Sequence, residues 1–367
     1  MKLRYKFAIG LLAIVAAGIT AIALAMSHTA DCEPVPELSK DGEQMKAILA
    51  RCYGAPDILE FTNVTKPSPA SDEVLVKVQA ASVNPLDWHQ MRGSPYIVRL
   101  GGGLGAPTDP RMGVDFAGTV EAVGTDVTGF KPGDEVFGGA GGAFAEYVTV
   151  RETRAVVHKP ANMSFEQAAT VPIAAITALQ ALRDKGQLQA GQKVLINGAS
   201  GGVGTFAVQI AKSMGAEVTG VCSTRNLEMV RSIGADHVFD YKHEDYTRSG
   251  QHYDLIIDTV GNHSPLVNRE VLTPNGKLVI VGGPKGNWLG PLMGMIKAML
   301  VGPFVDQEML TLLAQLKADD LTILADLMQT GKMTPVIDRR YSLSDIPAAI
   351  GYSEEGHVRG KIAVYME

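Results

Sequence analysis

Hydrophobic and polar positions in the first half of the chain alternate with a period close to two. The clearest run, Glu73–Gln79, reads EVLVKVQ, and such alternation is typical of a strand with one buried face. Further strands are predicted over 45–53, 113–124, 129–137 and 143–150, separated by turns rich in glycine and proline. Many short strands joined by tight turns predict an irregular, β-rich, barrel-like domain over 45–169.

The pattern changes near Ser164, which with Gln167 forms a capping box at the start of a helix. That helix is predicted to continue through Leu182, interrupted at Pro172. Beyond Gly191, apolar strand candidates over 193–197, 217–222, 237–239, 253–257 and 277–281 alternate with helical stretches. This alternation predicts a doubly wound α/β domain over 170–317, with a parallel sheet covered on both faces.

The last part of the chain, 318–367, is predicted to return to the first domain. It shows a helix, a strand over 334–343, a helix over 344–354 and a final strand over 361–366. The segment Leu289–Leu300, rich in methionine and leucine, has two interpretations. It is a core or dimer-contact helix, or a segment that lines the substrate or faces a membrane.

The stretch Lys193–Gly215 reads KVLINGASGGVGTFAVQIAKSMG and combines a strand, a glycine-rich turn and a helix. Glycines at such a turn admit positive φ and let a ligand approach the backbone, and the helix start attracts phosphate. A second strand follows one βα period later, as a dinucleotide site requires. The predicted cradle consists of Gly198, Ser200, Gly201, Gly202, Val203 and Gly204. The alternative is a tight βα turn that binds nothing.

The residues after the second strand indicate which dinucleotide is bound. An acidic residue there would hold the ribose hydroxyls of NAD, whereas a basic one accepts the 2′-phosphate of NADP. The chain has Ser223, Thr224 and Arg225 and no carboxylate, which favours NADPH as cofactor. The alternative is a solvated arginine that caps the next helix.

The amino terminus differs from the rest of the chain. Lys2, Arg4 and Lys6 precede an uncharged run, Phe7–Met26, of a length that can cross a bilayer. We therefore predict a membrane helix within residues 1–30, followed by a polar linker over 31–44. A cleaved signal peptide is the alternative. We expect a single-span membrane protein with its catalytic domain on the cytoplasmic side, the exported orientation being the other option.

Composition and charge exclude some classes of function. The net charge is −6, with 33 basic and 39 acidic residues mixed along the chain, so we expect no nucleic-acid partner. The three cysteines, Cys32, Cys52 and Cys222, are widely separated, which predicts neither a disulfide framework nor a four-thiolate zinc site. We therefore expect no metal, and a site built from hydrogen-bond donors and the cofactor.

From about Met45 to its end, the chain resembles the medium-chain dehydrogenase/reductase superfamily, in particular the zinc-independent quinone oxidoreductase-like branch near ζ-crystallin and the reticulon-4-interacting reductases. Val114 and Asp115 stand where zinc-dependent members have a His-Glu pair. The strings that carry the resemblance are Val83–Asp87, Gly113–Gly118, Phe130–Val136, Gly142–Tyr147, Val171-Pro172 with Thr177-Ala178, Gly198–Gly204 and Gly360-Lys361.

This resemblance implies a GroES-like catalytic domain beside a Rossmann domain, with NADPH in the cleft between them and a lipophilic quinone or conjugated carbonyl as substrate. It also implies a homodimer. Asn84 and Asp87 would lie beside the nicotinamide and the substrate carbonyl. The remaining implied contacts are Thr177, Gly282 and Gly283 near the nicotinamide, Ser223, Arg225 and Tyr241 near the 2′-phosphate, and Arg359 elsewhere on the cofactor.

His89 departs from the family pattern, because several quinone oxidoreductases have tyrosine there. A histidine can donate a proton at neutral pH, although such a residue is more often a packing residue. Asn84 precedes Pro85, and it has the alternative role of fixing a turn. Two hypotheses of function follow: a hydride-transferring reductase, or an NADPH-binding sensor or assembly module at a membrane without turnover.

Overall fold

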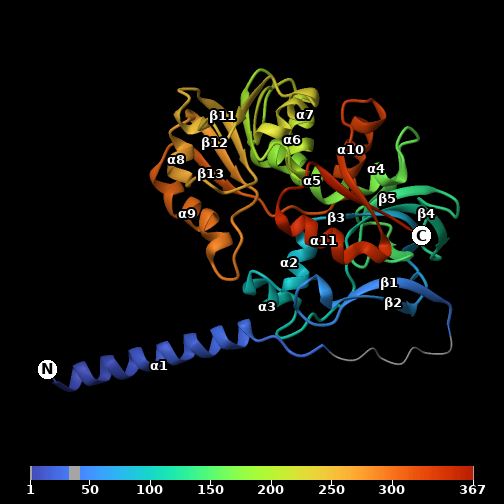
Figure 1. The fold of residues 1–367 in the computed structure, drawn as a ribbon, viewed down its shortest axis with the longest axis horizontal. Helices are drawn as coiled ribbons and strands as arrows, with labels where there is room; N and C mark the ends of the chain where they lie inside the picture. Colours follow the sequence, from blue (N-terminus) through green and yellow to red (C-terminus); the bar gives the residue numbers. More distant parts are fainter. Residues whose placement is uncertain (1, 33–41, 367) are drawn as a thin grey trace.

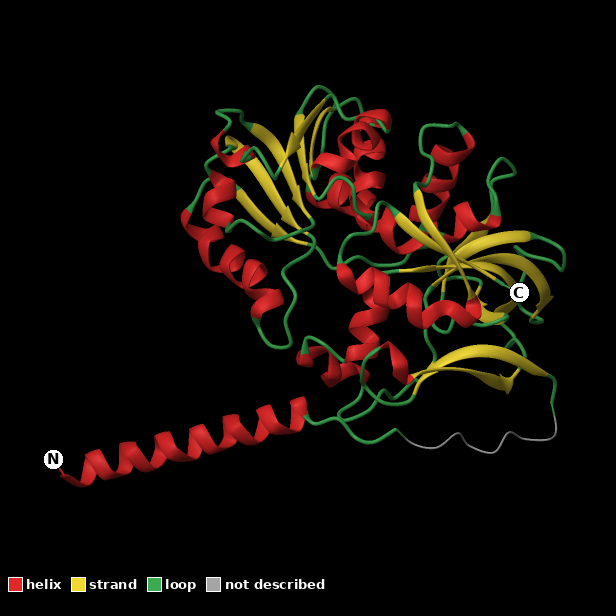
Figure 2. Ribbon diagram, in the orientation of Figure 1, coloured by secondary structure: helices red, strands yellow, loops and turns green. Residues whose placement is uncertain are grey.

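The computed structural model of the protein describes residues 2–32 and 42–366, with side chains from residue 15 onward. Figure 1 shows two sheet-centred parts side by side, with the long helix α1 (Lys2–Ser27) projecting from the body. Figure 2 shows that the strands gather in these two parts and that helices surround them. The architecture is the predicted α/β combination of a parallel sheet with covering helices and a β-rich domain.

The parallel sheet has six strands in the order β10-β9-β8-β11-β12-β13. Their bounds are β8 (Lys193–Asn197), β9 (Glu217–Cys222), β10 (His237–Asp240), β11 (Tyr253–Asp258), β12 (Leu272–Ile280) and β13 (Glu308–Thr311). The strands predicted over 193–197, 217–222, 237–239, 253–257 and 277–281 are confirmed, and β13 adds one that the pattern did not predict.

Both faces of this sheet are buried, as its apolar strands predict. Val194 and Ile196 pack on one face with Phe206, while Leu195 packs on the other with Ile256. The helices of this part are α5 (Pro172–Gln180), α6 (Gly202–Ser213), α7 (Leu227–Ser232), α8 (Pro265–Arg269) and α9 (Met293–Val301).

The second sheet has seven strands, in the order β14-β15-β3-β4-β5-β7 with β6 paired to β3. Their bounds are β3 (Glu73–Val83), β4 (Asp115–Val123), β5 (Glu135–Gly139), β6 (Tyr147–Arg151), β7 (Val156–His158), β14 (Ile337–Ser342) and β15 (Lys361–Tyr365). The C-terminal strand β15 is thus inserted between β14 and β3, so the end of the chain returns to this sheet.

The remaining elements surround this sheet. They are the hairpin β1 (Gln44–Ala50) with β2 (Leu59–Thr65), and the helices α2 (Pro85–Arg92), α3 (Arg99–Gly102), α4 (Phe165–Ala169), α10 (Ala318–Gln329) and α11 (Ile346–Glu355). The capping box of Ser164 and Gln167 is confirmed at the start of α4, and the predicted helix is broken before Pro172 into α4 and α5.

The amino-terminal prediction is corrected. Within the part of the chain that the structure describes, no helix combines the length and apolar character that a membrane span requires. The membrane helix predicted over 7–26, and the membrane localisation that depended on it, are therefore contradicted. Of the predicted linker, residues 33–41 lie outside the described residues.

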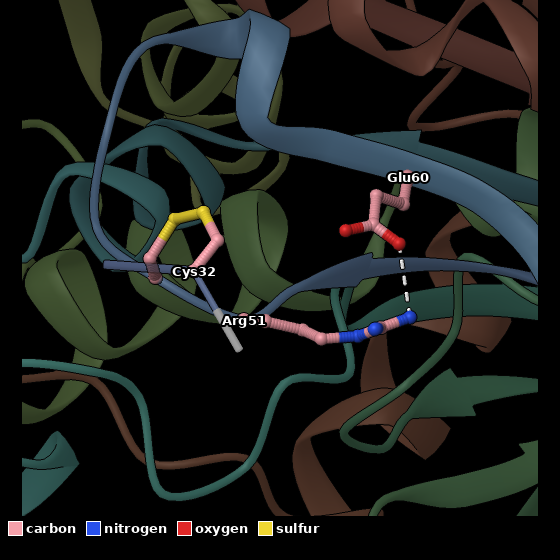
Figure 3. Close-up of a disulfide and its surroundings, with 4 residues drawn as sticks. Cys32, Arg51 and Glu60 are labelled. Atoms are coloured by element: carbon pink, nitrogen blue, oxygen red, sulfur yellow. Dashed lines mark ion pairs between the residues drawn. A yellow bond between two sulfur atoms is a disulfide. The ribbon is translucent and has the colours of Figure 1, made fainter. Parts of the chain in front are cut away.

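The cysteine prediction is also corrected, because Cys32 and Cys52 form a disulfide. Their Cα atoms lie 4.7 Å apart, and Figure 3 shows the bridge beside the ion pair of Arg51 and Glu60. Ala30 donates its N–H to the carbonyl of Gly105 at 2.9 Å, which brings this segment back onto the folded domain. Separation along the sequence therefore did not exclude a bridge, since the tertiary fold closes the distance.

The methionine-rich segment 289–300 contains α9, which packs one face on the core of the parallel sheet. Ala298 is fully buried in the cluster that includes Ile256 and Ile280, and Met295 packs against this cluster. On the other face, the side chains of Met299 and Leu300 are 71% and 67% exposed. The interpretation as a core helix therefore holds for one face of α9, and a dimer contact stays a prediction.

Candidate active site

The glycine-rich turn lies between β8 and α6, as the motif predicts. Gly198 has φ +87°, and a Cβ on Gly204 would lie 2.1 Å from the carbonyl oxygen of Gly198. At Gly201, in contrast, the nearest atom to an added Cβ is that same oxygen, 3.4 Å away. Two glycines are therefore required by the tight turn itself, and the third leaves the N-terminus of α6 approachable.

A cavity of about 610 Å³ begins at this turn and extends between the two sheets. Its walls combine Asn84 and Lys361 from the β-rich part with the glycine turn of the parallel part. The predicted site residues on its walls are Asn84, Gly198, Ser200, Gly201, Gly202, Val203, Gly204, Ser223, Arg225 and Tyr241. This volume lies in the range of ligand sites.

The outer end of the cavity carries the groups that were predicted to select the nucleotide. Asn226 donates its side-chain amide to the hydroxyls of Ser200 (3.0 Å) and Ser223 (3.2 Å), so it joins the glycine turn to the end of β9. Arg225 donates to the main-chain carbonyl of His357 at 2.6 Å. Tyr241 is 58% exposed. Sequence reasoning missed Asn226, although it directly follows the three residues singled out there.

The inner end of the cavity is organised around Asn84, which is 1% exposed and precedes the first turn of α2. The N–H of Asn84 donates to Asp87 at 2.6 Å, so the two residues form one half of a capping box. The amide Nδ2 of Asn84 donates to Asp115 Oδ2 at 2.8 Å. Asn84 thus both fixes the turn and reaches into the cavity wall.

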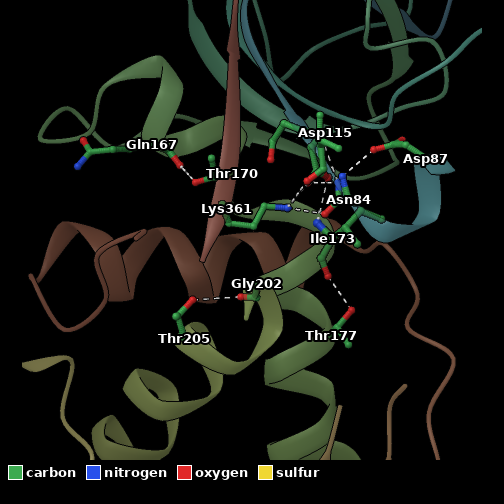
Figure 4. Close-up of polar contacts among 12 residues, drawn as sticks. Asn84, Asp87, Asp115, Gln167, Thr170, Ile173, Thr177, Gly202, Thr205 and Lys361 are labelled. Atoms are coloured by element: carbon green, nitrogen blue, oxygen red, sulfur yellow. Dashed lines mark hydrogen bonds and ion pairs between the residues drawn. The ribbon is translucent and has the colours of Figure 1, made fainter. Parts of the chain in front are cut away.

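Asp115 and Lys361 complete this inner cluster, and both were missed as site residues (Figure 4). Lys361 donates to Asn84 Oδ1 and to the carbonyl of Val83, and its ammonium lies 3.7 Å from Asp115 Oδ2. The second oxygen of Asp115 accepts from the N–H of Ile173, at 3.0 Å, in the first turn of α5. The strands β4 and β15, the junction between β3 and α2, and the helix α5 of the parallel part therefore meet at this cluster.

Burial determines the protonation of this cluster. Desolvation raises the pKa of Asp87 to about 7 and that of Asp115 to about 6, although the charge of Lys361 opposes both shifts. Burial also lowers the pKa of Lys361, against the attraction of the two carboxylates. The cluster can thus hold or release a proton near neutral pH.

The other predicted residues lie away from the cavity walls. Asp87 lies behind Asn84, and Nδ1 of His89 pairs with the carbonyl of Ser94 at 2.5 Å. Burial lowers the pKa of His89. The remaining ones, with their contacts, are Thr177 (hydroxyl to Ile173 O, 2.6 Å), Thr224 (hydroxyl to Asp240), Gly282 (N–H to Asp258 O, 3.3 Å), Gly283, and Arg359 (N–H to Asp338, 3.0 Å).

Metal ligands do not gather in the described part of the chain: across residues 2–32 and 42–366, no group of three or more histidine, cysteine or acidic residues could hold an ion. At the inner end of the cavity, the ammonium of Lys361 lies beside the carboxylate of Asp115.

Comparisons with known proteins identify the family of this chain. The family of the alcohol dehydrogenase GroES-like domain matches residues 70–161, and that of the zinc-binding dehydrogenase matches residues 233–364. The quinone-oxidoreductase QR1 of Triphysaria versicolor, described as chloroplastic, is 36% identical over 341 residues, covering 88% of this chain and 99% of the relative. The chain belongs to the medium-chain dehydrogenase/reductase superfamily. Within it, this protein is a quinone oxidoreductase-like oxidoreductase, as the sequence resemblance implied.

Two further relatives place the chain in the same branch of the superfamily. The mitochondrial NAD(P)H oxidoreductase RTN4IP1 of Homo sapiens is 35% identical over 363 residues, covering 85% of this chain and 87% of that protein. The solved structure of the quinone oxidoreductase from Coxiella burnetii has a TM-score of 0.78 and 31% identity, covering 89% of this chain and all of that one.

Proposed function

We propose that this protein is a zinc-independent, NADPH-dependent reductase of quinones, enones or related conjugated carbonyls. The observation that supports it best is that one cavity of about 610 Å³ connects the glycine turn to Asn84 and Lys361 of the polar cluster. A reductase of this kind needs both ends, one to hold a dinucleotide and one to stabilise the charge that develops on the acceptor.

The residues present fit a dinucleotide. The open position at Gly201 and the N-terminus of α6 suit a pyrophosphate, since a side chain there would project into the cavity. Ser223, Arg225 and Tyr241 at the outer end suit a 2′-phosphate, because they offer hydroxyls and a guanidinium without a carboxylate. When bound, the reduced nicotinamide supplies a hydride.

The protein's own groups would perform the remaining tasks. Asn84 lines the cavity at the start of α2 and would orient and polarise the carbonyl oxygen of the substrate. It would do so through its second amide N–H, whose contact with the carbonyl of Ser82 is long, at 3.4 Å. Asp87 and Asp115 do not line the cavity, so the proton that follows the hydride would come from solvent as the reduced product leaves. The apolar walls, including Ile173 and Val83, would exclude water from this end.

The test is a substrate panel run with the purified protein. Quinones, enones, aldehydes and saturated ketones are each offered with NADPH and with NADH. The rate is measured as the loss of the absorbance of the reduced nicotinamide. We expect turnover with quinones or enones, a lower KM for NADPH than for NADH, and no change on addition of a zinc chelator. NADPH binding without reduction of any acceptor would refute the proposal and favour the sensor or assembly hypothesis.

A further inference from the structure

Lys361 connects the two ends of the cavity. It is the first residue of β15, and the preceding Gly360 donates its N–H to the carbonyl of Ser200 in the glycine turn at 2.8 Å. The aliphatic part of Lys361 lies along this turn, since a Cβ on Gly202 would be 3.2 Å from Lys361 Cδ. The stem of the lysine therefore packs on the turn, while its ammonium reaches Asn84.

The contacts of Asn84 leave its side-chain amide one orientation. A lysine ammonium can only donate, so the amide oxygen of Asn84 must face Lys361. The amide nitrogen then faces Asp115 Oδ2 at 2.8 Å, and this carboxylate is fixed in turn by the N–H of Ile173. All three side chains are at most 3% exposed, so water does not compete for these bonds. Figure 4 shows Asn84, Asp115 and Lys361 joined by dashed lines, with Asp87 on the other side of Asn84.

We propose that Lys361 is a positioning residue of the reaction, which acts by holding the amide of Asn84 in this orientation. The proposal rests on the proposed function, in which Asn84 contacts the reacting carbonyl. Without the ammonium, the amide oxygen of Asn84 loses its donor and Asp115 loses the counter-charge beside it. The amide is then free to rotate or flip, and the polarising group is misplaced.

This role differs from that of a phosphate ligand. If Lys361 bound the nucleotide phosphates, its loss would weaken NADPH binding. Because the ammonium is directed at Val83, Asn84 and Asp115, its loss should reduce the rate of the chemical step instead. The ratio of these two effects therefore decides between the roles.

The central experiment compares Lys361→Met, Asn84→Ala and the double variant with the wild-type protein. NADPH dissociation constants are measured by fluorescence titration, and kcat is measured with the best acceptor of the panel. We expect Lys361→Met to lower kcat by roughly 10- to 100-fold, with the dissociation constant of NADPH changed by less than about threefold. In the Asn84→Ala background, Lys361→Met should lower kcat no further, because it acts through that amide.

Two controls keep the result interpretable. Lys159→Met removes a lysine whose side chain is as buried (5% exposed) and is paired with Glu135 at 2.9 Å, but which lies off the cavity, and it should leave kcat unchanged. Lys361→Arg keeps a charged donor and should retain more of the wild-type kcat than Lys361→Gln. If Lys361→Met does not fold, the comparison of Lys361→Arg with Lys361→Gln tests the inference in its place. Equal kcat values for these two variants would overturn it.

A readout without cofactor is the side-chain amide signal of Asn84 in ¹⁵N-labelled protein. We expect two separate, sharp N–H resonances in the wild type and exchange-broadened ones in the lysine variant. The inference is overturned by unchanged kcat in Lys361→Met, by additive losses in the double variant, or by a rise in the NADPH dissociation constant alone. A wild-type protein that reduces no acceptor would instead overturn the proposed function. The amide signals would still show whether Lys361 holds the side chain of Asn84 in one orientation.

Discussion

Asp87 gives the structure a pH dependence that one substitution should remove. The side chain is 0% exposed, and burial raises the pKa of its carboxyl from 3.8 to about 7. Since the folded pKa lies above the unfolded one, this group favours the folded state below about pH 4. That contribution is lost as the pH rises through the folded pKa.

The size of the effect follows from the shift. Each pKa unit corresponds to about 1.4 kcal/mol, so the full rise from 3.8 to about 7 corresponds to about 4 kcal/mol. About 3 kcal/mol of this should be lost between about pH 5 and pH 8, because the unfolded carboxyl is already ionised at pH 5 while the folded one stays protonated until the pH passes about 7. Asp87→Asn keeps an acceptor for the N–H of Asn84 but cannot ionise, so its stability should lack this component.

The measurement is urea unfolding of the protein without cofactor, at several pH values between about 5 and 8. Trp88, next to Asp87 on α2, is a local fluorescence probe once Trp288 has been replaced by phenylalanine. We expect the wild type to lose about 3 kcal/mol more than Asp87→Asn across this range. Asp126→Asn, at an exposed carboxyl, should follow the wild type. Equal pH slopes for the wild type and Asp87→Asn would refute the reasoning.

Three further predictions concern the disulfide, the outer end of the cavity and the glycine turn. Reduction of the disulfide, or Cys32→Ser, should lower the free energy of unfolding in urea by about 3 kcal/mol, since the bridge joins residues 20 positions apart. An unfolding curve that does not change in reductant would contradict this. Arg225→Ala should raise the KM for NADPH roughly tenfold and leave that for NADH nearly unchanged, because it removes a guanidinium on the cavity wall; equal changes with both nucleotides would speak against a 2′-phosphate site. Gly204→Ala should destabilise the protein by about 1–3 kcal/mol in thermal unfolding, because its Cβ would lie 2.1 Å from a backbone oxygen. In Gly201→Ala, the nearest atom to the added Cβ lies 3.4 Å away. This variant should therefore fold normally and lose affinity for NADPH.

Much of the fold could be predicted from periodicity because its strands are long enough to show a pattern. The bounds of β8 and β9 agree with the prediction, since each is an apolar run between a turn and a helix. The strands β7 and β13 were missed because three or four residues are too few to show a period, whereas β10, also of four residues, was found from its place in the alternation of strands and helices. The disulfide was missed because Cys32 and Cys52 meet only when the segment before the described hairpin returns to the loop at Gly105.

The site was only partly predictable. The glycine turn is local, so its motif and its structure agree. Asn84 and Asp87 were found through a family resemblance, and their mutual hydrogen bond is also local. Lys361 lies 277 positions from Asn84, and no periodic pattern relates the two. One signal was present: a lysine opens the otherwise apolar strand KIAVY, where burial demands a partner for the charge.

The position of Lys361 has a consequence for how the site assembles. The strand β15 pairs with β3, which ends in Val83, and the register places Ile362 opposite that residue. The ammonium of Lys361 can therefore reach Asn84 only after the last strand has entered the sheet between β14 and β3. Because Asp115 is held by the N–H of Ile173, the cluster also requires α5 of the other part to be docked. The inner end of the cavity is thus complete only when both sheets and the C-terminal strand are in place, which couples the catalytic geometry to the integrity of the whole fold rather than to either domain alone.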